Sequence, residues 1–147
     1  MIVKRNYRVI PILVIILLFI FQSCNFDQVE SEFSDFKTAD KDGLFDKGWI
    51  PSDLVFNSMT NIYQRTNPDL NSCIFNYNLT KTDLEKLKLK VQPSSARFKK
   101  LHRVRTSSDW IKSANQFNHY YYVRSSQTDT VYIAIDEKNS KIYGWRK

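Results

Sequence analysis

The pattern of apolar and polar positions divides the chain into an apolar leader and a mixed remainder. The leader contains an unbroken apolar run of 13 residues, Val9 to Phe21, which follows Lys4, Arg5 and Arg8 and precedes Ser23 and Cys24. A secretory signal peptide has a basic N-terminal region, an apolar middle and small residues at its cleavage site. A helix that spans the hydrocarbon core needs about 20 residues, so this run is short for a permanent span. We therefore expect residues 1–23 to be an export signal, and an uncleaved anchor that includes Gln22 and Ser23 stays open.

Period-two alternation is clearest near the C-terminus. Three segments rich in Tyr, Val and Ile, residues 119–124, 131–136 and 141–146, are separated by loops of six and four residues. This spacing predicts a three-stranded antiparallel meander. In the middle segment positions 131, 133 and 135 face one side and positions 132 and 134 the other, as expected of a sheet with one packed face. Gly144 in the last segment would let another group approach the backbone closely.

The central part of the chain predicts a hairpin followed by a helix. Residues 61–65 and 72–78 alternate, and the Asn-Pro-Asp content of the six residues between them is typical of a turn, so we expect two antiparallel strands. Thr80 with Asp83 is a variant of the capping box. Leu84 and Leu87 then recur at helical spacing, which predicts a helix over residues 80–89 that ends before Pro93.

Shorter helices are predicted on either side of this unit. Thr38 can cap a helix over residues 39–47 that Gly48 ends, and Pro51 can open a helical turn over residues 52–54. Ser107 or Ser108 can cap a further short helix that ends at about Ala114. The fold class is therefore α+β: a small antiparallel sheet of about five strands, including the C-terminal three-stranded meander, with two or three short helices.

Residues 24–37 precede this predicted domain and are polar and acidic. Low hydrophobicity and like charges keep such a segment extended, so we expect an acidic tether over residues 24–37 that lifts the domain off the membrane. Phe33 and Phe36 could still dock onto the domain. The 124 residues that follow position 23 fit one domain, and we assign residues 38–147 to a single α+β domain.

The residues Phe21-Gln22-Ser23-Cys24 resemble a loose form of the lipobox of bacterial lipoproteins, in which a small residue precedes the cysteine that becomes the acylated first residue. Ser23 and Cys24 fit the motif, whereas Phe21 and Gln22 differ from its usual aliphatic and small residues. The resemblance implies a diacylglyceryl thioether on Cys24, and several acyl chains together make a stable anchor. The other interpretation is an ordinary thiol behind a plain cleavage site.

The segment from Gly48 to Asn78 resembles a family of small uncharacterised bacterial proteins of the YbbD-head type. The shared features are a Gly-Trp-aliphatic-Pro element, an Asn-Ile pair that opens a strand, a Thr-Asn turn and an aromatic-rich strand, which here are Gly48-Trp49-Ile50-Pro51, Asn61-Ile62, Thr66-Asn67 and Phe75. The resemblance supports the fold class and implies no agreed activity. We expect Trp49 and Pro51 to be scaffold residues, with Trp49 buried between a short helix and the sheet.

Charge narrows the classes of partner. The formal net charge of +7 falls to +4 without the three basic residues of the leader, because 19 basic residues then face 15 acidic ones. A basic protein can bind nucleic acid, but an exported and anchored chain meets lipid head groups, glycans and envelope proteins, so we exclude nucleic acid.

The basic residues concentrate in a strip, residues 97–105, in which no acid occurs: Arg97, Lys99, Lys100, His102, Arg103 and Arg105. The strip is either a solvated loop, as most charge runs are, or a contact surface for anionic head groups, acidic glycan or an acidic protein. Each Lys or Arg near an anionic membrane surface contributes about 1 kcal/mol.

The sequence contains no arrangement of residues that indicates a reaction. Cys73 lies in an apolar run, which predicts an inert buried thiol, because a catalytic thiol needs a nearby histidine and His102 and His119 lie in other segments. Two isolated histidines supply no metal site, and three distant glycines supply no phosphate-binding loop. We therefore predict no catalytic residues, no metal and no cofactor.

These features favour a non-enzymatic lipoprotein of the cell envelope. It would be anchored by lipid on Cys24 to the outer membrane or to the periplasmic face of the inner membrane, where it would contact another envelope component. The alternative is an immunity or inhibitor lipoprotein that neutralises a toxin or a hydrolase, for which the size and the anchor are equally suitable. A hydrolase whose catalytic residues are scattered along the sequence is the third hypothesis.

Overall fold

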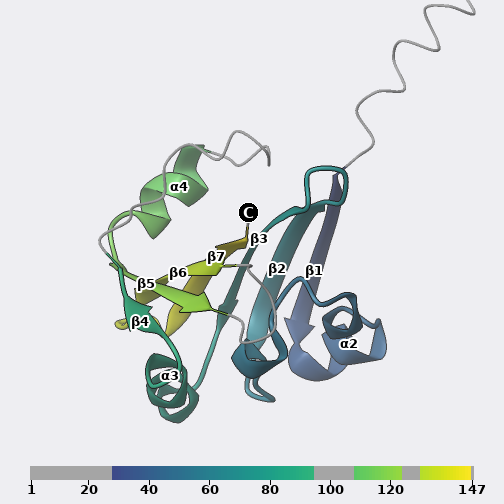
Figure 1. The fold of residues 1–147 in the computed structure, drawn as a ribbon. Helices are drawn as coiled ribbons and strands as arrows, with labels where there is room; N and C mark the ends of the chain where they lie inside the picture. Colours follow the sequence, from purple (N-terminus) through teal and green to yellow (C-terminus); the bar gives the residue numbers. More distant parts are fainter. Residues whose placement is uncertain (1–27, 95–107, 124–129, 147) are drawn as a thin grey trace, which may run out of the picture.

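A computed structural model of the chain describes residues 28–94, 108–123 and 130–146. Their strands form one antiparallel sheet in the order β1-β2-β3-β7-β6-β5-β4 (Figure 1). The fold is α+β with an antiparallel sheet, as predicted, but the sheet has seven strands rather than about five, since β1 and β4 add to its two edges. The strands are β1 Val29–Asp35, β2 Thr60–Asn67, β3 Ser72–Asn78, β4 Gln92–Pro93, β5 Asn118–Val123, β6 Thr130–Asp136 and β7 Lys141–Arg146.

Helices cover both faces of this sheet. In the described ranges there are three α-helices, α2 (Phe36–Lys41), α3 (Lys81–Lys88) and α4 (Ser108–Ala114), and two short 3-10 turns, η2 (Phe45–Lys47) and η3 (Ser52–Leu54). α2 and α3 contribute buried residues to the larger apolar core, whereas α4 packs in a second, smaller core. The larger core therefore lies on one face of the sheet and the smaller core on the other.

Strand β1 corrects the prediction of a tether over residues 24–37. It pairs with β2 from Val29 opposite Thr66 to Asp35 opposite Thr60, and Phe33 and Phe36 pack against the larger core. The like charges do not keep the segment in solvent because Glu30 and Glu32 share the side of the strand that points away from this core. The folded domain thus begins by Val29, nine residues before the predicted start at residue 38.

The segment predicted as one helix over residues 39–47 is two elements. α2 begins earlier than predicted because the Asp35 side chain, not Thr38, caps it by accepting a hydrogen bond from the Thr38 amide at 2.9 Å. Gly43 then adopts a left-handed conformation (φ 69°), which breaks the helix and lets Leu44 enter the core. Gly48 ends η2 in the left-handed conformation, as the C-cap prediction required.

The hairpin and the following helix are confirmed. β2 and β3 pair antiparallel, and α3 begins after Thr80, whose hydroxyl accepts a hydrogen bond from the Asp83 amide at 3.3 Å. Leu84 and Leu87 are buried in the larger core. Hydrophobic spacing and the cap together were sufficient to place this helix, because both are local properties of the chain.

The C-terminal meander is also confirmed, with β5, β6 and β7 adjacent in the sheet. The expectation of one packed face is wrong, since Ala134 and Tyr132 belong to the smaller core, where Trp110 of α4 and Tyr143 also pack. Gly144 allows the close approach that was predicted: a Cβ atom built there would lie 2.1 Å from Cζ of Phe75.

Residues 1–23, with the predicted signal, lie outside the described residues, as does Cys24. In the described part of the chain, no helix is both long enough and apolar enough to span a membrane.

Candidate functional site

The structure does not describe the residues that the sequence marked as candidate sites. Cys24 lies before residue 28, and the strip with Arg97, Lys99, Lys100, Arg103 and Arg105 lies between residues 94 and 108. The structure does describe the first element that follows Cys24 and the first element that follows the strip. The first strand begins at Val29, five residues after Cys24, and α4 begins at Ser108, three residues after Arg105.

The register of the sheet defines two opposite ends. One end, here called the attachment end, is where β1 begins, and its row of paired residues is Val29, Thr66, Cys73, Arg146 and Val131. The other, the far end, is where β1 finishes, and its row is Asp35, Thr60, Asn78, Lys141 and Asp136. Any anchor that precedes residue 28 therefore reaches the domain at the attachment end.

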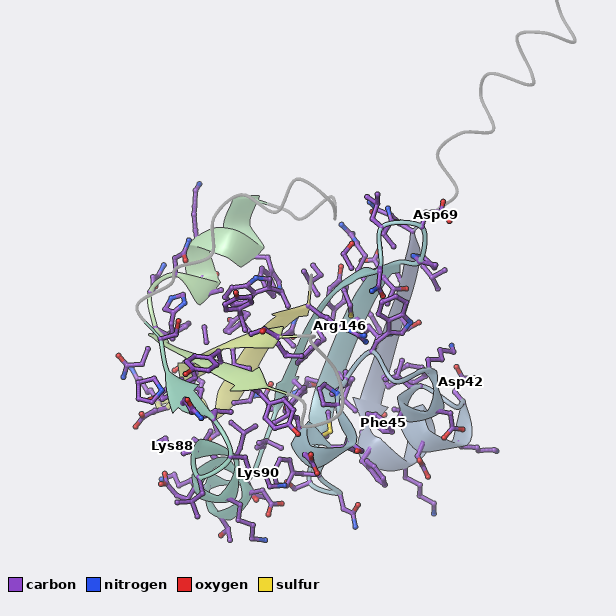
Figure 2. All side chains as sticks on the ribbon, in the orientation of Figure 1. Asp42, Phe45, Asp69, Lys88, Lys90 and Arg146 are labelled. Carbon is purple, nitrogen blue, oxygen red and sulfur yellow. The ribbon has the colours of Figure 1, made fainter. Side chains whose placement is uncertain are left out.

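The tip of the β2–β3 hairpin, residues 68–71, lies at the attachment end, and Figure 2 shows Asp69 there. The tip is built by local hydrogen bonds. The Asn67 side chain accepts from the Leu70 amide at 3.1 Å, and the Pro68 carbonyl accepts from the Asn71 amide at 3.1 Å. Asn71 takes a left-handed conformation (φ 45°), which asparagine tolerates better than most residues. This turn holds the Leu70 side chain in an exposed position.

A charged cluster joins β1 to β2 beside this end. The Tyr63 hydroxyl donates to Glu30 Oε1 at 2.6 Å, and Arg65 Nη2 donates to both Glu30 carboxylate oxygens at 2.9 and 3.0 Å. The Tyr63 hydrogen bond and the Arg65 guanidinium lower the pKa of Glu30, whereas burial and the bond to Glu30 raise the pKa of Tyr63 to about 12. At neutral pH the Glu30 carboxyl is ionised and the Tyr63 phenol is protonated. The cluster therefore stabilises the pairing of β1 with β2 and is not suited to transferring protons.

The Gly-Trp-aliphatic-Pro element packs against the last strand, β7. Arg146 Nη1 donates to the Gly48 carbonyl at 3.1 Å, and the Arg146 guanidinium lies 5.7 Å from the centroid of the Trp49 ring. Pro51 is buried, and Trp49 packs against the larger core while remaining half-buried. Figure 2 shows Arg146 in the middle of the domain, between the two halves of the sheet. The expectation of a buried Trp49 is therefore wrong, because one side of the ring packs on the core and Arg146 lies over the ring. Arg146 connects the last strand to the loop before η3.

Cys73 has the surroundings of a core residue. It is fully buried (0 % exposed), and desolvation raises the pKa of its thiol far above the ordinary value. Its side chain belongs to the larger core, whereas His119 stacks edge-on against Trp145 in the smaller core on the other face of the sheet. The two residues therefore form no thiolate–imidazole pair, and the interpretation of Cys73 as an inert buried thiol is supported. His102 lies outside the described residues.

Two lysines at the C-terminal end of α3 hold that end at the far end of the sheet. Lys88 bridges Glu85 of its own helix at 3.1 Å and Glu137 of the β6–β7 turn at 3.0 Å. Lys90 donates to the Asp53 carbonyl at 2.6 Å and lies 4.9 Å from the Phe56 ring centroid. These contacts hold the C-terminal end of α3 against the turns of the far end (Figure 2).

The described residues contain no group of three or more histidine, cysteine or carboxylate side chains placed to hold a metal ion. The candidate site that remains is the attachment end itself. It combines the point where the chain that follows Cys24 joins the fold with an ordered tip that exposes an apolar side chain. The sequence did not indicate this end, because β1 was not predicted and β2 was predicted to end at residue 65 instead of Asn67.

Residues 27–78 match the family model of the YbbD head domain. The match spans 52 of the 147 residues and covers the unit from β1 to β3, so it extends the resemblance seen over residues 48–78 back to the start of the first strand. No curated protein and no solved structure matches the chain. The family match therefore covers the start of β1 and the β2–β3 tip but not β5 to β7, and it brings no activity with it.

Proposed function

We propose that the protein is a lipid-anchored lipoprotein of the cell envelope, whose domain is a non-enzymatic binding module held directly on the membrane surface. The observation that carries this proposal is the start of β1 at Val29, five residues after Cys24. A fully extended chain advances at most about 3.5 Å per residue, so about 17 Å separates the two Cα atoms at most. An acylated Cys24 would hold the domain against the head groups instead of lifting it away.

The chemistry of the described residues supports a binding role rather than catalysis. Tyr63 is held protonated beside an ionised Glu30, and Cys73 is buried as a thiol. Asp83 is committed to the cap of α3, where it accepts from Ser58 at 2.7 Å and from Lys86 at 2.8 Å. General acid–base or nucleophilic catalysis needs a group whose pKa is tuned toward neutrality and which substrate can reach. The pKa values of Glu30 and Asp83 are instead lowered, which keeps them charged, and those of Tyr63 and Cys73 are raised, which keeps them neutral.

The distribution of charge gives the module a second contact with an anionic surface. Without residues 1–23 the chain has 19 basic and 15 acidic residues, and five of the basic ones lie in the strip over residues 97–105. The rest of the mature chain then has 14 basic and 15 acidic residues and is close to neutral. The whole positive character of the mature protein thus comes from one segment, which we propose contacts anionic head groups, acidic glycan or an acidic envelope protein.

The anchor is tested by expressing the full chain in a bacterium with lipoprotein maturation, extracting the membrane fraction and measuring the intact mass. We expect a chain that begins at Cys24 and carries a diacylglyceryl group. Cys24→Ser should abolish acylation and cleavage at this position, whereas Cys73→Ala is the matched control and should retain both. A full-length unmodified chain, or a chain cut elsewhere with a free Cys24 thiol, would overturn the lipoprotein assignment.

A further inference from the structure

Large apolar side chains are exposed at three positions in the described ranges: Val29 (52 % exposed), Leu70 (42 %) and Leu89 (88 %). Scattered exposed apolar residues need no explanation by themselves. Here, however, two of the three lie at the same end of the sheet. Val29 opens β1 opposite Thr66, and Leu70 lies in the hairpin tip that directly follows Asn67. Both are at the attachment end, whereas Leu89 follows α3 at the far end.

Leu70 is exposed by a turn that is fixed on both sides. Its amide is held by the Asn67 side chain, and the next residue is held by the Pro68 carbonyl. Asn67 itself is buried, so the anchor of this turn is part of the domain. Because the backbone is already ordered, insertion of the Leu70 side chain into an apolar medium would cost little additional chain entropy.

We propose that the attachment end is a membrane-contacting surface, in which Leu70 and Val29 enter the interfacial region of the bilayer that holds the anchor while the far end points into the aqueous phase. The proposal rests on the proposed function only in requiring an anchor that precedes Val29. The four residues between Cys24 and Val29 restrict how far the attachment end can move away from the bilayer. A short tether also keeps the effective concentration of the surface at the membrane high.

A lipid surface fits this end better than a second copy of the chain. The open edge of β1 could in principle pair with another β1 strand. Glu30 and Glu32 lie on the same side of the strand, however, and an antiparallel pair of β1 strands centred on Ser31 would place the glutamates of the two copies opposite each other. Like charges directly opposite one another destabilise a strand pair, so the acids protect the edge while the apolar side chains at its start stay available to lipid.

The proposal fixes which surface can meet a soluble partner. If the attachment end rests on the bilayer, the far end carries α3 and the β6–β7 turn outward, with Leu89 exposed between Lys88 and Lys90 (Figure 2). Lys88 is already bound to Glu85 and Glu137, so this end is an ordered surface. A partner in the aqueous phase would approach the domain from this side.

The test compares a reporter at Leu70 with a matched reporter at Leu89. Full-length protein is produced with Leu70→Cys or Leu89→Cys, labelled with the environment-sensitive dye NBD and reconstituted into phosphatidylethanolamine–phosphatidylglycerol vesicles that contain a doxyl-lipid quencher. The unsubstituted chain is the labelling blank, because Cys73 is buried and should not react. We expect a blue shift and quenched emission at position 70, with neither change at position 89.

Equal responses at both positions, or a response at 89 alone, would overturn the proposal. A blue shift at position 70 that depends on protein concentration and is insensitive to the lipid quencher would also overturn it, because it would indicate contact between copies. The intact mass of the same sample reports the state of Cys24 separately. If the apolar leader is retained instead of a lipid, the lipoprotein assignment fails, and Cys24→Ser is added to both reporters so that only positions 70 and 89 carry the dye.

Discussion

At the scale of single residues, Gly144 is the position at which one methyl group has the largest predicted effect. A Cβ atom there would overlap the Phe75 ring, whose nearest carbon would lie 2.1 Å away, and Phe75 is fully buried in the larger core. Forcing extra atoms into a packed core typically costs about 1–3 kcal/mol, occasionally more. We expect Gly144→Ala to reduce the free energy of unfolding by at least about 2 kcal/mol, measured by urea denaturation.

The control for this prediction removes the obstacle. On a Phe75→Leu background, in which the ring is absent, Gly144→Ala should destabilise the protein much less than it does in the parent. The prediction is wrong if the substitution costs the same on both backgrounds, since the cause would then lie in the backbone of β7 and not in the contact with Phe75.

At the scale of elements, α3 was predicted almost to its ends, and β1 was not predicted at all. α3 carries its own signals, namely a cap and two leucines at helical spacing. β1 has few apolar residues and four acids in and just before it, so its sequence alone is typical of a solvated segment. It is a strand because β2 offers a complete row of hydrogen-bonding partners and because Tyr63 and Arg65 neutralise Glu30. β4 has only two residues and depends likewise on β5.

The cap of α3 provides the prediction at this scale. The Thr80 hydroxyl accepts from the Asp83 amide, and loss of such a cap typically costs about 1 kcal/mol. Thr80→Ala should therefore lower the free energy of unfolding by about that amount. Thr82→Ala is the matched control, because Thr82 is exposed within the same helix and alanine is a better helix former. Equal destabilisation by the two variants would contradict the capping role.

At the scale of the whole molecule, the charge of the chain and the proposed anchor on Cys24 concern the same proposed membrane contact. The strip over residues 97–105 ends three residues before α4, and Figure 1 shows α4 and the β2–β3 tip on the same upper side of the view. The strip lies outside the described residues, and we propose that it meets the same anionic membrane as the attachment end. Anionic lipids would then add an electrostatic contribution to the apolar contact.

This contribution is measured with a soluble chain that lacks residues 1–23 and carries Cys24→Ser. Replacing Lys99, Lys100 and Arg103 by Gln should weaken sedimentation with anionic vesicles at low salt by about tenfold or more, since each cation contributes about 1 kcal/mol, and should flatten the salt dependence. The control replaces the exposed Lys37, Lys47 and Lys81 by Gln, which removes the same charge elsewhere. If both triple variants lose the same affinity, the strip acts only through net charge.

The sequence by itself determined the features that depend on neighbouring residues: the apolar leader and the lipobox resemblance, the β2–β3 hairpin, α3 with its cap, α4 and the C-terminal meander. Each is encoded by a periodicity, a cap or a turn within about ten residues. Only the tertiary structure decided that β1 joins the sheet, that both faces of the sheet are packed, and that Val29 and Leu70 share one end. These three depend on which strands lie side by side, and hydrogen bonds and burial across a sheet join residues as distant as Val29 and Thr66, or Cys73 and Arg146.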